Sequence, residues 1–364
     1  MKRIVCVLSI IVVIAMFLTP LIQPGEVFAA SLREEMIAKA KKEGTLVVAG
    51  SLAEDIATNL TGFKKMYPFI NVRHMEINTK DTINRVVTEA QAGRLSIDWT
   101  GTSEDGAEIL ARRGFLAKND FPHLKDFRAN SQPPHGLYVS GVVNCRVQGI
   151  YNTELVSPAE APKSWDEMGD PKWKGKTMLA RSAEEFPGRL AWLWRDKDGK
   201  WDWERSFELF RKLKAHDPVI GQSFPGGAQR VAAGEVGIFW FAPPTVAANL
   251  ALRGAPLGLI VIPKFFGGLR AWTNLKDAAH PGAAWLMTDF LTSAEGQYEW
   301  TEKIGAHLPL NLKAKLGKGT QWAVDQGISH EKLELIDLRD ADKIYSPEVQ
   351  EKSETFFFKL LGLR

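Results

Sequence analysis

The sequence predicts an α/β fold of two lobes, joined by two crossing strands, with a ligand cleft between them. The spacing of apolar residues alternates between the period of a helix and that of a strand, which is typical of βαβ units around a mostly parallel sheet. Extended runs at 137–143 and 147–151 interrupt this alternation, and a further run at 257–262 is placed to carry the chain back. Lobes joined by two crossings can close on a ligand by hinge motion.

The first lobe is expected to begin with an amphipathic helix that Gly44 ends, followed by a short buried strand. Pro68 stops the second helix, and Gly93 stops the third. The expected elements, in chain order, are helix 32–42, strand 45–49, helix 53–66, strand 70–77, helix 81–92, strand 96–100 and helix 105–113.

After the crossing, the alternation of helices and strands starts afresh. The expected elements are helix 165–168, strand 177–180, helix 203–214, strand 236–241, and helices 279–291, 293–304 and 353–361. The sequence therefore predicts a first lobe of residues 30–143 plus about 263–310, a second lobe of residues 144–262, and a C-terminal helical region of residues 311–364 that packs on the lobes.

The N-terminus has the pattern of a cleaved export signal. Lys2 and Arg3 precede an apolar run at 4–18, and Val27-Phe28-Ala29 matches the small-residue pattern of a signal-peptidase cleavage site. A signal anchor is the competing interpretation, but the run is shorter than the roughly 20 residues that span a bilayer. We therefore expect residues 1–29 to be a signal peptide and the mature protein to be periplasmic or otherwise extracytoplasmic.

Composition narrows the possible partners and cofactors. Removing 29 of the 364 residues leaves 335, and removing the net +1 of the signal from the formal charge of +3 leaves +2. Without a polybasic tract, nucleic acid and membrane surfaces are poor partners, and we expect a monomer that binds a small molecule.

Cys145 is the single cysteine after cleavage, so no internal disulfide is expected. The histidines show no zinc-like spacing, and we expect neither a resident metal nor a cofactor.

Six segments carry a family resemblance: "KEGTLVVAGS" (42–51), "GIYNTELV" (149–156), "APKSWDEMGDPKWKGK" (161–176), "RVAAGEVGI" (230–238), "RGAPLGLIVIP" (253–263) and "AAHPGAAWLMTDFLTSAEGQ" (278–297). In these segments the chain resembles the extracellular solute-binding proteins of ABC importers, in the branch that contains ferric-ion, phosphonate, thiamine and polyamine binders. The resemblance implies a bilobed type II periplasmic-binding-protein fold that delivers its ligand to a membrane permease. An exported sensor or scavenging protein of the same fold is the alternative.

Open α/β sheets bind ligands outside the carboxyl ends of their strands. Applied to the expected strands, this rule selects Ser51, Thr102, Ser103, Arg181, Ser182 and Thr245 as candidate ligand contacts. The hydroxyl residues could instead cap helices. Arg181 is the sharpest candidate, because a guanidinium presents two parallel donors to a carboxylate or phosphonate. Its alternative role is an ion pair with Glu184 or Glu185.

The loop "GQSFPGGAQR" at 221–230 raises the question of catalysis. A nucleophile elbow needs glycine two residues after the serine, where Pro225 stands, and the loop also lacks the spacing and lysine of a phosphate loop. We therefore expect a binding protein and no enzyme. Gly226 and Gly227 precede a helix expected at 228–233, whose N-terminal N–H groups suit an anion. The competing interpretation is a plain loop.

The remaining candidates are aromatic. Phe224 and Trp240 lie near expected strand ends, where a ring could stack on a ligand. Together with Arg181, the 223–230 loop is predicted to clamp a negatively charged group. The resemblance also bears on iron, because ferric-binding relatives place adjacent tyrosines where Pro244 and Thr245 stand here. A tyrosinate iron site is therefore not expected, and binding of chelated ferric iron stays an alternative.

Overall fold

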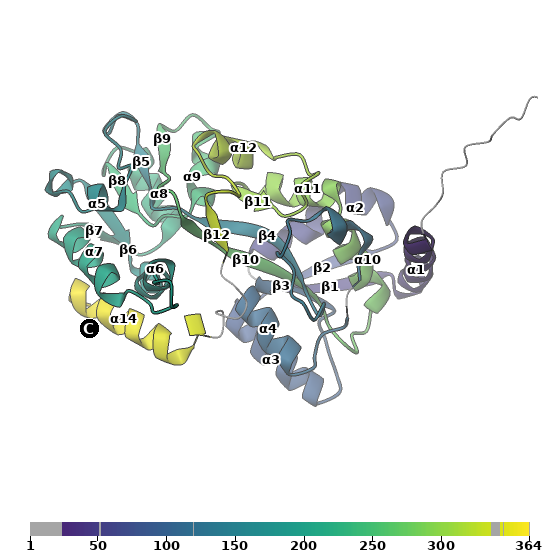
Figure 1. Ribbon diagram of the computed structural model, residues 1–364. Coiled ribbons are helices and arrows are strands. Elements are labelled where there is room, and N and C mark those ends of the chain that lie inside the picture. Colours follow the sequence, from purple (N-terminus) through teal and green to yellow (C-terminus); the bar gives the residue numbers. More distant parts are fainter. Residues whose placement is uncertain (1–23, 51, 119, 336–342, 345, 364) are drawn as a thin grey trace, which may run out of the picture.

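The computed structural model describes residues 24–50, 52–118, 120–335, 343–344 and 346–363. Within these residues, a seven-stranded and a five-stranded sheet organise the molecule, each with its own helices (Figure 1). We call the part built on the larger sheet the first half and the part built on the smaller sheet the second half. The predicted α/β class with two sheets is confirmed. Most of the signal segment, residues 1–23, lies outside the described residues.

The larger sheet has the strand order β11-β4-β10-β3-β1-β2, with β12 beside β10. Strand β1 is parallel to β2 and β3, whereas β10 runs antiparallel to both β3 and β4. The strands are β1 (Thr45–Gly50), β2 (Asn71–Glu76), β3 (Trp99–Ser103), β4 (Val139–Arg146), β10 (Phe265–Asn274), β11 (His307–Pro309) and β12 (Leu333–Leu335).

The smaller sheet has the order β7-β6-β8-β5-β9. Its strands are β5 (Gly149–Asn152), β6 (Thr177–Ala180), β7 (Val219–Gly221), β8 (Ile238–Trp240) and β9 (Leu257–Ile260). The chain passes from the first half to the second between β4 and β5, and it returns between β9 and β10. We refer to β4 and β10, which pair with each other, as the crossing strands.

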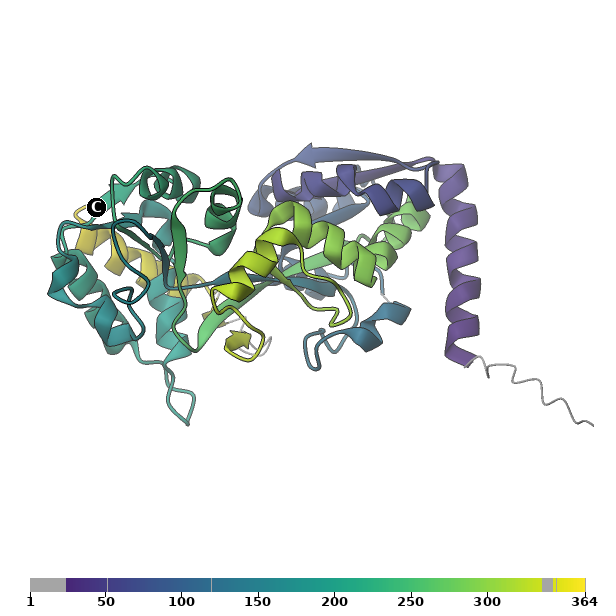
Figure 2. The ribbon, with the colours of Figure 1, turned by 90° about the horizontal axis from the view of Figure 1, so that it is seen from above.

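Helices cover both sheets. Those of the first half include α1 (Pro24–Glu43), η1 (Leu52–Asn59), α2 (Thr61–Met66), α3 (Thr79–Gln91), α4 (Glu104–Arg112), η2 (Pro122–Asp126), α10 (Pro281–Thr292), α11 (Ala294–Ile304) and α12 (Lys318–Asp325). Those of the second half include α5 (Trp165–Met168), η3 (Pro171–Trp173), η4 (Arg181–Ala183), α6 (Phe186–Leu193), α7 (Trp203–Ala215), α8 (Phe224–Ala232), α9 (Pro244–Ala251) and α14 (Pro347–Leu361). Helix α1 packs on α10 at the end of the molecule remote from the second half (Figure 2).

Short polar caps fix where several helices begin. Asn78 accepts a hydrogen bond from the Asp81 backbone N–H at the start of α3, and Asp202 does the same for Arg205 at the start of α7. These caps satisfy backbone donors that have no partner within the helix. The resulting helices bury one apolar face each against the sheets, in core clusters that contain Trp99, Trp272 and Trp240.

Several local expectations need correction, among them three that concern the crossing strands and the candidate contacts. Strand β3 spans 99–103 instead of 96–100, because its antiparallel pairing with β10 continues to Ser103. Residues 144–146, expected to separate two extended runs, continue β4 and pair with β10. Helix α8 begins at Phe224 instead of residue 228, since Ser223 caps it and Pro225 fits its first turn.

Candidate functional site

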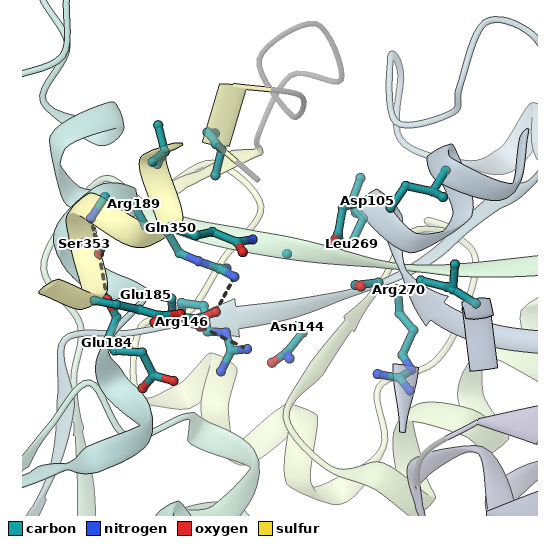
Figure 3. Close-up of a pocket in the computed structure, with 18 of the residues that line it drawn as sticks. Asp105, Asn144, Arg146, Glu184, Glu185, Arg189, Leu269, Arg270, Gln350 and Ser353 are labelled. Atoms are coloured by element: carbon teal, nitrogen blue, oxygen red, sulfur yellow. Dashed lines mark hydrogen bonds and ion pairs between the residues drawn. The ribbon is translucent and has the colours of Figure 1, made fainter. Parts of the chain in front are cut away.

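A cavity of about 640 Å³ lies between the two halves, beside the crossing strands (Figure 3). Its walls come from β3, α3 and α4 on one side and from residues 184–189 and α14 on the other. Four arginines line it: Arg113, Arg146, Arg189 and Arg270. An equal number of carboxylates also line it, so the placement of the arginines, more than the total charge, determines what the cavity can bind.

The crossing strands present a polar face. Residues directly opposite each other on paired strands point to the same face of a sheet, as do residues two apart on one strand. Asn144 is opposite Gly268, and Arg270 is opposite Ser103. Arg146 is two residues after Asn144. These five residues therefore share one face, and all five line the cavity.

Gly268 leaves open space in the middle of this face. A Cβ atom built on Gly268 would meet no atom within 4 Å, and its φ is outside the left-handed region. The neighbouring Gly267 is different, because its Cβ would lie 2.5 Å from Val143 and 2.7 Å from Leu333. Glycine inside a strand often marks a close approach by a ligand or by another part of the protein. A side chain at position 267 would collide with neighbouring residues of the protein, whereas Gly268 faces the cavity.

One ion pair and one contact between a guanidinium and an aromatic ring join the crossing strands to the second half. Arg189 Nη2 lies 2.6 Å from Glu185 Oε2, and Arg146 Nη2 lies 3.8 Å from Glu185 Oε1. Arg189 is 9% exposed, and its guanidinium lies 5.6 Å from the centre of the Phe266 ring on β10. Glu185 therefore orients two guanidinium groups at the edge of the cavity (Figure 3).

The electrostatic influence of these arginines extends to His307. This residue is opposite Asn144 in the β11–β4 pair and is 3% exposed. Burial, together with the positive charges of Arg270 and Arg146, lowers the pKa of His307 to about 3. His307 is thus neutral at pH 7. The buried Asn144 Oδ1 and His307 Nδ1 have no hydrogen-bond partner among the described residues.

A buried acid lies directly behind the cavity wall. Glu104 is between the lining residues Ser103 and Asp105, is 5% exposed, and accepts a hydrogen bond of 2.8 Å from Ser140 Oγ. Burial raises the pKa of Glu104 to about 8, and the charges of Asp105 and Glu108 act in the same direction. Glu104 is therefore largely protonated at neutral pH.

Of the predicted contacts in the first half, Ser103 lines the cavity. Thr102, its neighbour on β3, is 1% exposed and points to the opposite face, and Ser51 is outside the described residues. Arg181 and Ser182 follow β6 as predicted, but both are exposed and neither lines the cavity. The Arg181 guanidinium instead lies 5.6 Å from the centre of the Phe358 ring on α14.

The 223–230 loop follows β7, which pairs with β6, so it shares a sheet edge with Arg181 as predicted. Ser223 caps α8 by accepting a 3.3 Å hydrogen bond from the Gly226 N–H. Gly227 is buried, and a Cβ there would collide with the ring of Phe239. The loop's second glycine therefore permits tight packing of α8 on the sheet, and none of residues 223–227 lines the cavity.

The predicted aromatic contacts pack within the protein. Trp240 has no exposed surface and belongs to the second half's core, so it is a core residue in this conformation. Phe224 packs 5.9 Å from Phe239, measured between ring centres. Thr245 lies in the first turn of α9, partly buried and away from the cavity.

The cavity residues that sequence analysis missed include Asn144, Arg146, Gly268 and Arg270 on the crossing strands and Arg189 on α6. Strand β10 was not expected at all. Its segment "FFGGLRAWTN" carries aromatic residues typical of a strand at both ends, but two central glycines weaken that pattern.

The described residues contain no group of three or more His, Cys, Asp or Glu side chains that could hold a metal ion. No helix in the described part of the chain has both the length and the apolar character needed to cross a membrane. What the cavity offers is a set of guanidinium groups, amides and hydroxyls suited to a polar solute.

Comparison with known proteins gives three kinds of match. The profile of the bacterial extracellular solute-binding protein family matches residues 60–327, more than half of the chain. A Haemophilus influenzae protein described as uncharacterized is 26% identical over 276 residues, covering 71% of this chain and 75% of that protein. The resemblance inferred from the sequence motifs is therefore confirmed.

Solved structures share the fold. The fructose-6-phosphate-bound periplasmic binding protein AfuA from Actinobacillus pleuropneumoniae matches with a TM-score of 0.65 and 20% identity, covering 88% of this chain and 99% of that one. Iron-bound HitA from Pseudomonas aeruginosa matches with a TM-score of 0.67 and 18% identity, covering 85% and 99%. At these identities the similarity establishes the periplasmic-binding-protein fold and not the ligand.

Proposed function

The chain belongs to the bacterial extracellular solute-binding protein family, and we propose that it captures a small organic anion for an ABC importer and delivers it to a membrane permease. The family consists of extracellular solute-binding proteins, and the similar AfuA structure is that of a periplasmic binding protein. We propose the same location for the present protein. We also propose that residues 1–29 are its cleaved export signal and that the mature protein acts as a monomer.

One observation carries the choice of ligand. The open space over Gly268 is flanked on its own face by Arg270, Asn144 and Arg146. A guanidinium that binds a carboxylate or phosphate makes charged hydrogen bonds, each contributing about 1.5–3 kcal/mol. Two such groups near one open position therefore favour an anion over a cation or an apolar molecule.

The route of the chain supports closure around that ligand. The chain crosses between the halves at residues 146–149 and again at 260–265. We propose that the lobes comprise residues 30–143 plus about 263–310 and residues 144–262, with the two crossings near their boundaries. Hinge bending at the two crossings would bring residues 184–189 towards Ser103 and α4, and would shield the solute from water. The C-terminal region, residues 311–364, adds β12 to the first sheet and α14 to the second half.

A thermal-shift screen of the purified protein tests the ligand class. The panel contains organic carboxylates, phosphonates, sugar phosphates, ferric citrate, polyamines and thiamine compounds. We expect stabilisation by one or more anions, of about 2.7 kcal/mol at 100 times the dissociation constant. A Gly268→Val variant is the control and should lose the shift. Stabilisation by a polyamine or thiamine alone would contradict the proposed ligand class.

A further inference from the structure

Helix α14 forms part of the cavity although it lies beyond residue 327, where the family match ends. It contributes Val349, Gln350, Ser353 and Glu354 to the lining. In Figure 3 the helix stands on the side of α6, facing the crossing strands. A segment outside the matched region therefore contributes to the shape of the proposed ligand site.

The position of α14 is fixed by specific contacts with the second half. Ser353 Oγ donates a 2.6 Å hydrogen bond to the Glu184 carbonyl oxygen and accepts a 3.0 Å bond from the Gly188 N–H. The rings of Phe356 and Phe207 stack with centres 3.8 Å apart. Ser346 caps the start of the helix. The two hydrogen bonds of Ser353 connect α14 to the same 184–189 segment that carries Glu185 and Arg189.

Gln350 is an uncharged polar side chain of α14 that lines the cavity, beside Ser353 and Glu354 of the same helix. It lies three residues before Ser353 and so on the same helical face. Figure 3 shows its side chain beside that of Arg189, directed away from α14 towards the crossing strands. Gln350 is exposed, and no hydrogen bond of its carboxamide is seen among the described residues. A carboxamide both donates and accepts hydrogen bonds without carrying charge, which suits a hydroxyl group.

We propose that Gln350 is a specificity-determining residue, which contacts the bound solute through its carboxamide and selects organic anions that carry a hydroxyl group. This inference rests on the proposed function, because it assumes that an organic anion occupies the cavity beside the arginines. Arg146, Arg189 and Arg270 would bind the charge of many anions, whereas Gln350 would distinguish one anion from another.

Calorimetric titration with matched probes tests this role. Each pair differs by a hydroxyl group: malate and succinate, citrate and tricarballylate, glycerol 3-phosphate and propyl phosphate. We expect the wild-type protein to prefer the hydroxylated member of at least one pair by about 3- to 10-fold, the effect of one neutral hydrogen bond. Gln350→Ala should bind both members with similar affinity. In Gln350→Glu the new side chain has nearly the same shape but carries a negative charge, so binding of both members of each pair should be weaker through charge repulsion.

Glu351→Ala is the matched control, because Glu351 is an exposed residue on the same helix that lies outside the cavity. It should retain the wild-type preference. A preference that survives in Gln350→Ala, or no preference in the wild-type protein while Gly268→Val abolishes binding, would overturn the role of Gln350 and leave the proposed function standing. If the wild-type protein binds neither these six probes nor any anion of the thermal-shift panel, the organic-anion proposal fails and this inference fails with it.

Discussion

Gly227 at the start of α8 and Gly268 in β10 show how differently two glycines beside polar residues can be used. A side chain at Gly227 would collide with Phe239, whereas one at Gly268 would enter open space beside Arg270 and Asn144. The first glycine allows a helix to approach a sheet, and the second leaves room for a solute. Glycine alone does not identify a binding site, because the surroundings of the missing side chain determine its role.

The largest difference between two variants is expected when valine replaces each of these two glycines in turn. Gly268→Val should weaken binding of the solute identified by the screen on the order of 100-fold, since its side chain would occupy the ligand space. It should fold normally, because valine favours strands. Gly227→Val should lower the free energy of unfolding by about 1–3 kcal/mol through overpacking. Calorimetry and thermal unfolding separate the two effects, and normal binding by Gly268→Val would refute the assignment of the cavity.

Arginine substitutions sharpen the same comparison. Arg270→Ala should weaken anion binding by about 10- to 100-fold, in line with the loss of a charged hydrogen bond. Arg181→Ala should have a much smaller effect, because Arg181 is exposed beside Phe358 and away from the cavity. Isothermal titration decides between them. A larger loss of affinity in Arg181→Ala than in Arg270→Ala would instead place the anion site at the sheet edge formed by β6 and β7.

Glu104 behind the cavity wall should make stability depend on pH. Between about pH 4.5 and 8, folded Glu104 keeps a proton that the unfolded chain has lost, so stability due to this group falls as pH rises through that range. Glu104→Gln removes this loss and can keep the hydrogen bond with Ser140. The variant should therefore be more stable than wild type at pH 8, by a few kcal/mol, with a smaller difference at pH 5. Denaturant unfolding at the two pH values measures this, and a constant difference would contradict the assignment.

The smallest effect on binding is expected at Ser223, the cap of α8. Ser223→Ala should reduce stability by about 1 kcal/mol, because the Gly226 N–H loses its partner. Solute affinity should not change, since Ser223 is outside the cavity. A clear loss of affinity in this variant would indicate that the loop contacts the solute after all.

Sequence patterns predicted the fold better than the site, for identifiable reasons. Strands β1 and β6 and helix α7 have strong local patterns, and the structure places them within a residue or so of the expected bounds. The family resemblance was also carried by short contiguous segments of the sequence. In contrast, Asn144 and Arg146 interrupt an apolar run in the sequence, yet they belong to β4 because pairing with β10 satisfies their backbone groups.

The rule that ligands bind beyond strand ends found Ser103 and missed most of the cavity. Arg146 and Arg270 lie within the crossing strands, Arg113 follows helix α4, and Arg189 lies several residues beyond the end of β6. Residue spacing along the chain does not show which distant segments face each other. The role of α14 has the same origin, because Gln350 reaches the cavity through packing on α6 and α7.

A crystal structure of the protein with the solute identified by the screen tests the central claim most directly. The account predicts electron density for the solute over Gly268, with its anionic group contacting Arg270 or Arg146 and the two halves closed around it. Density for the solute at Arg181 and the Gly226 N–H, with the cavity beside Gly268 occupied by water alone, would contradict it.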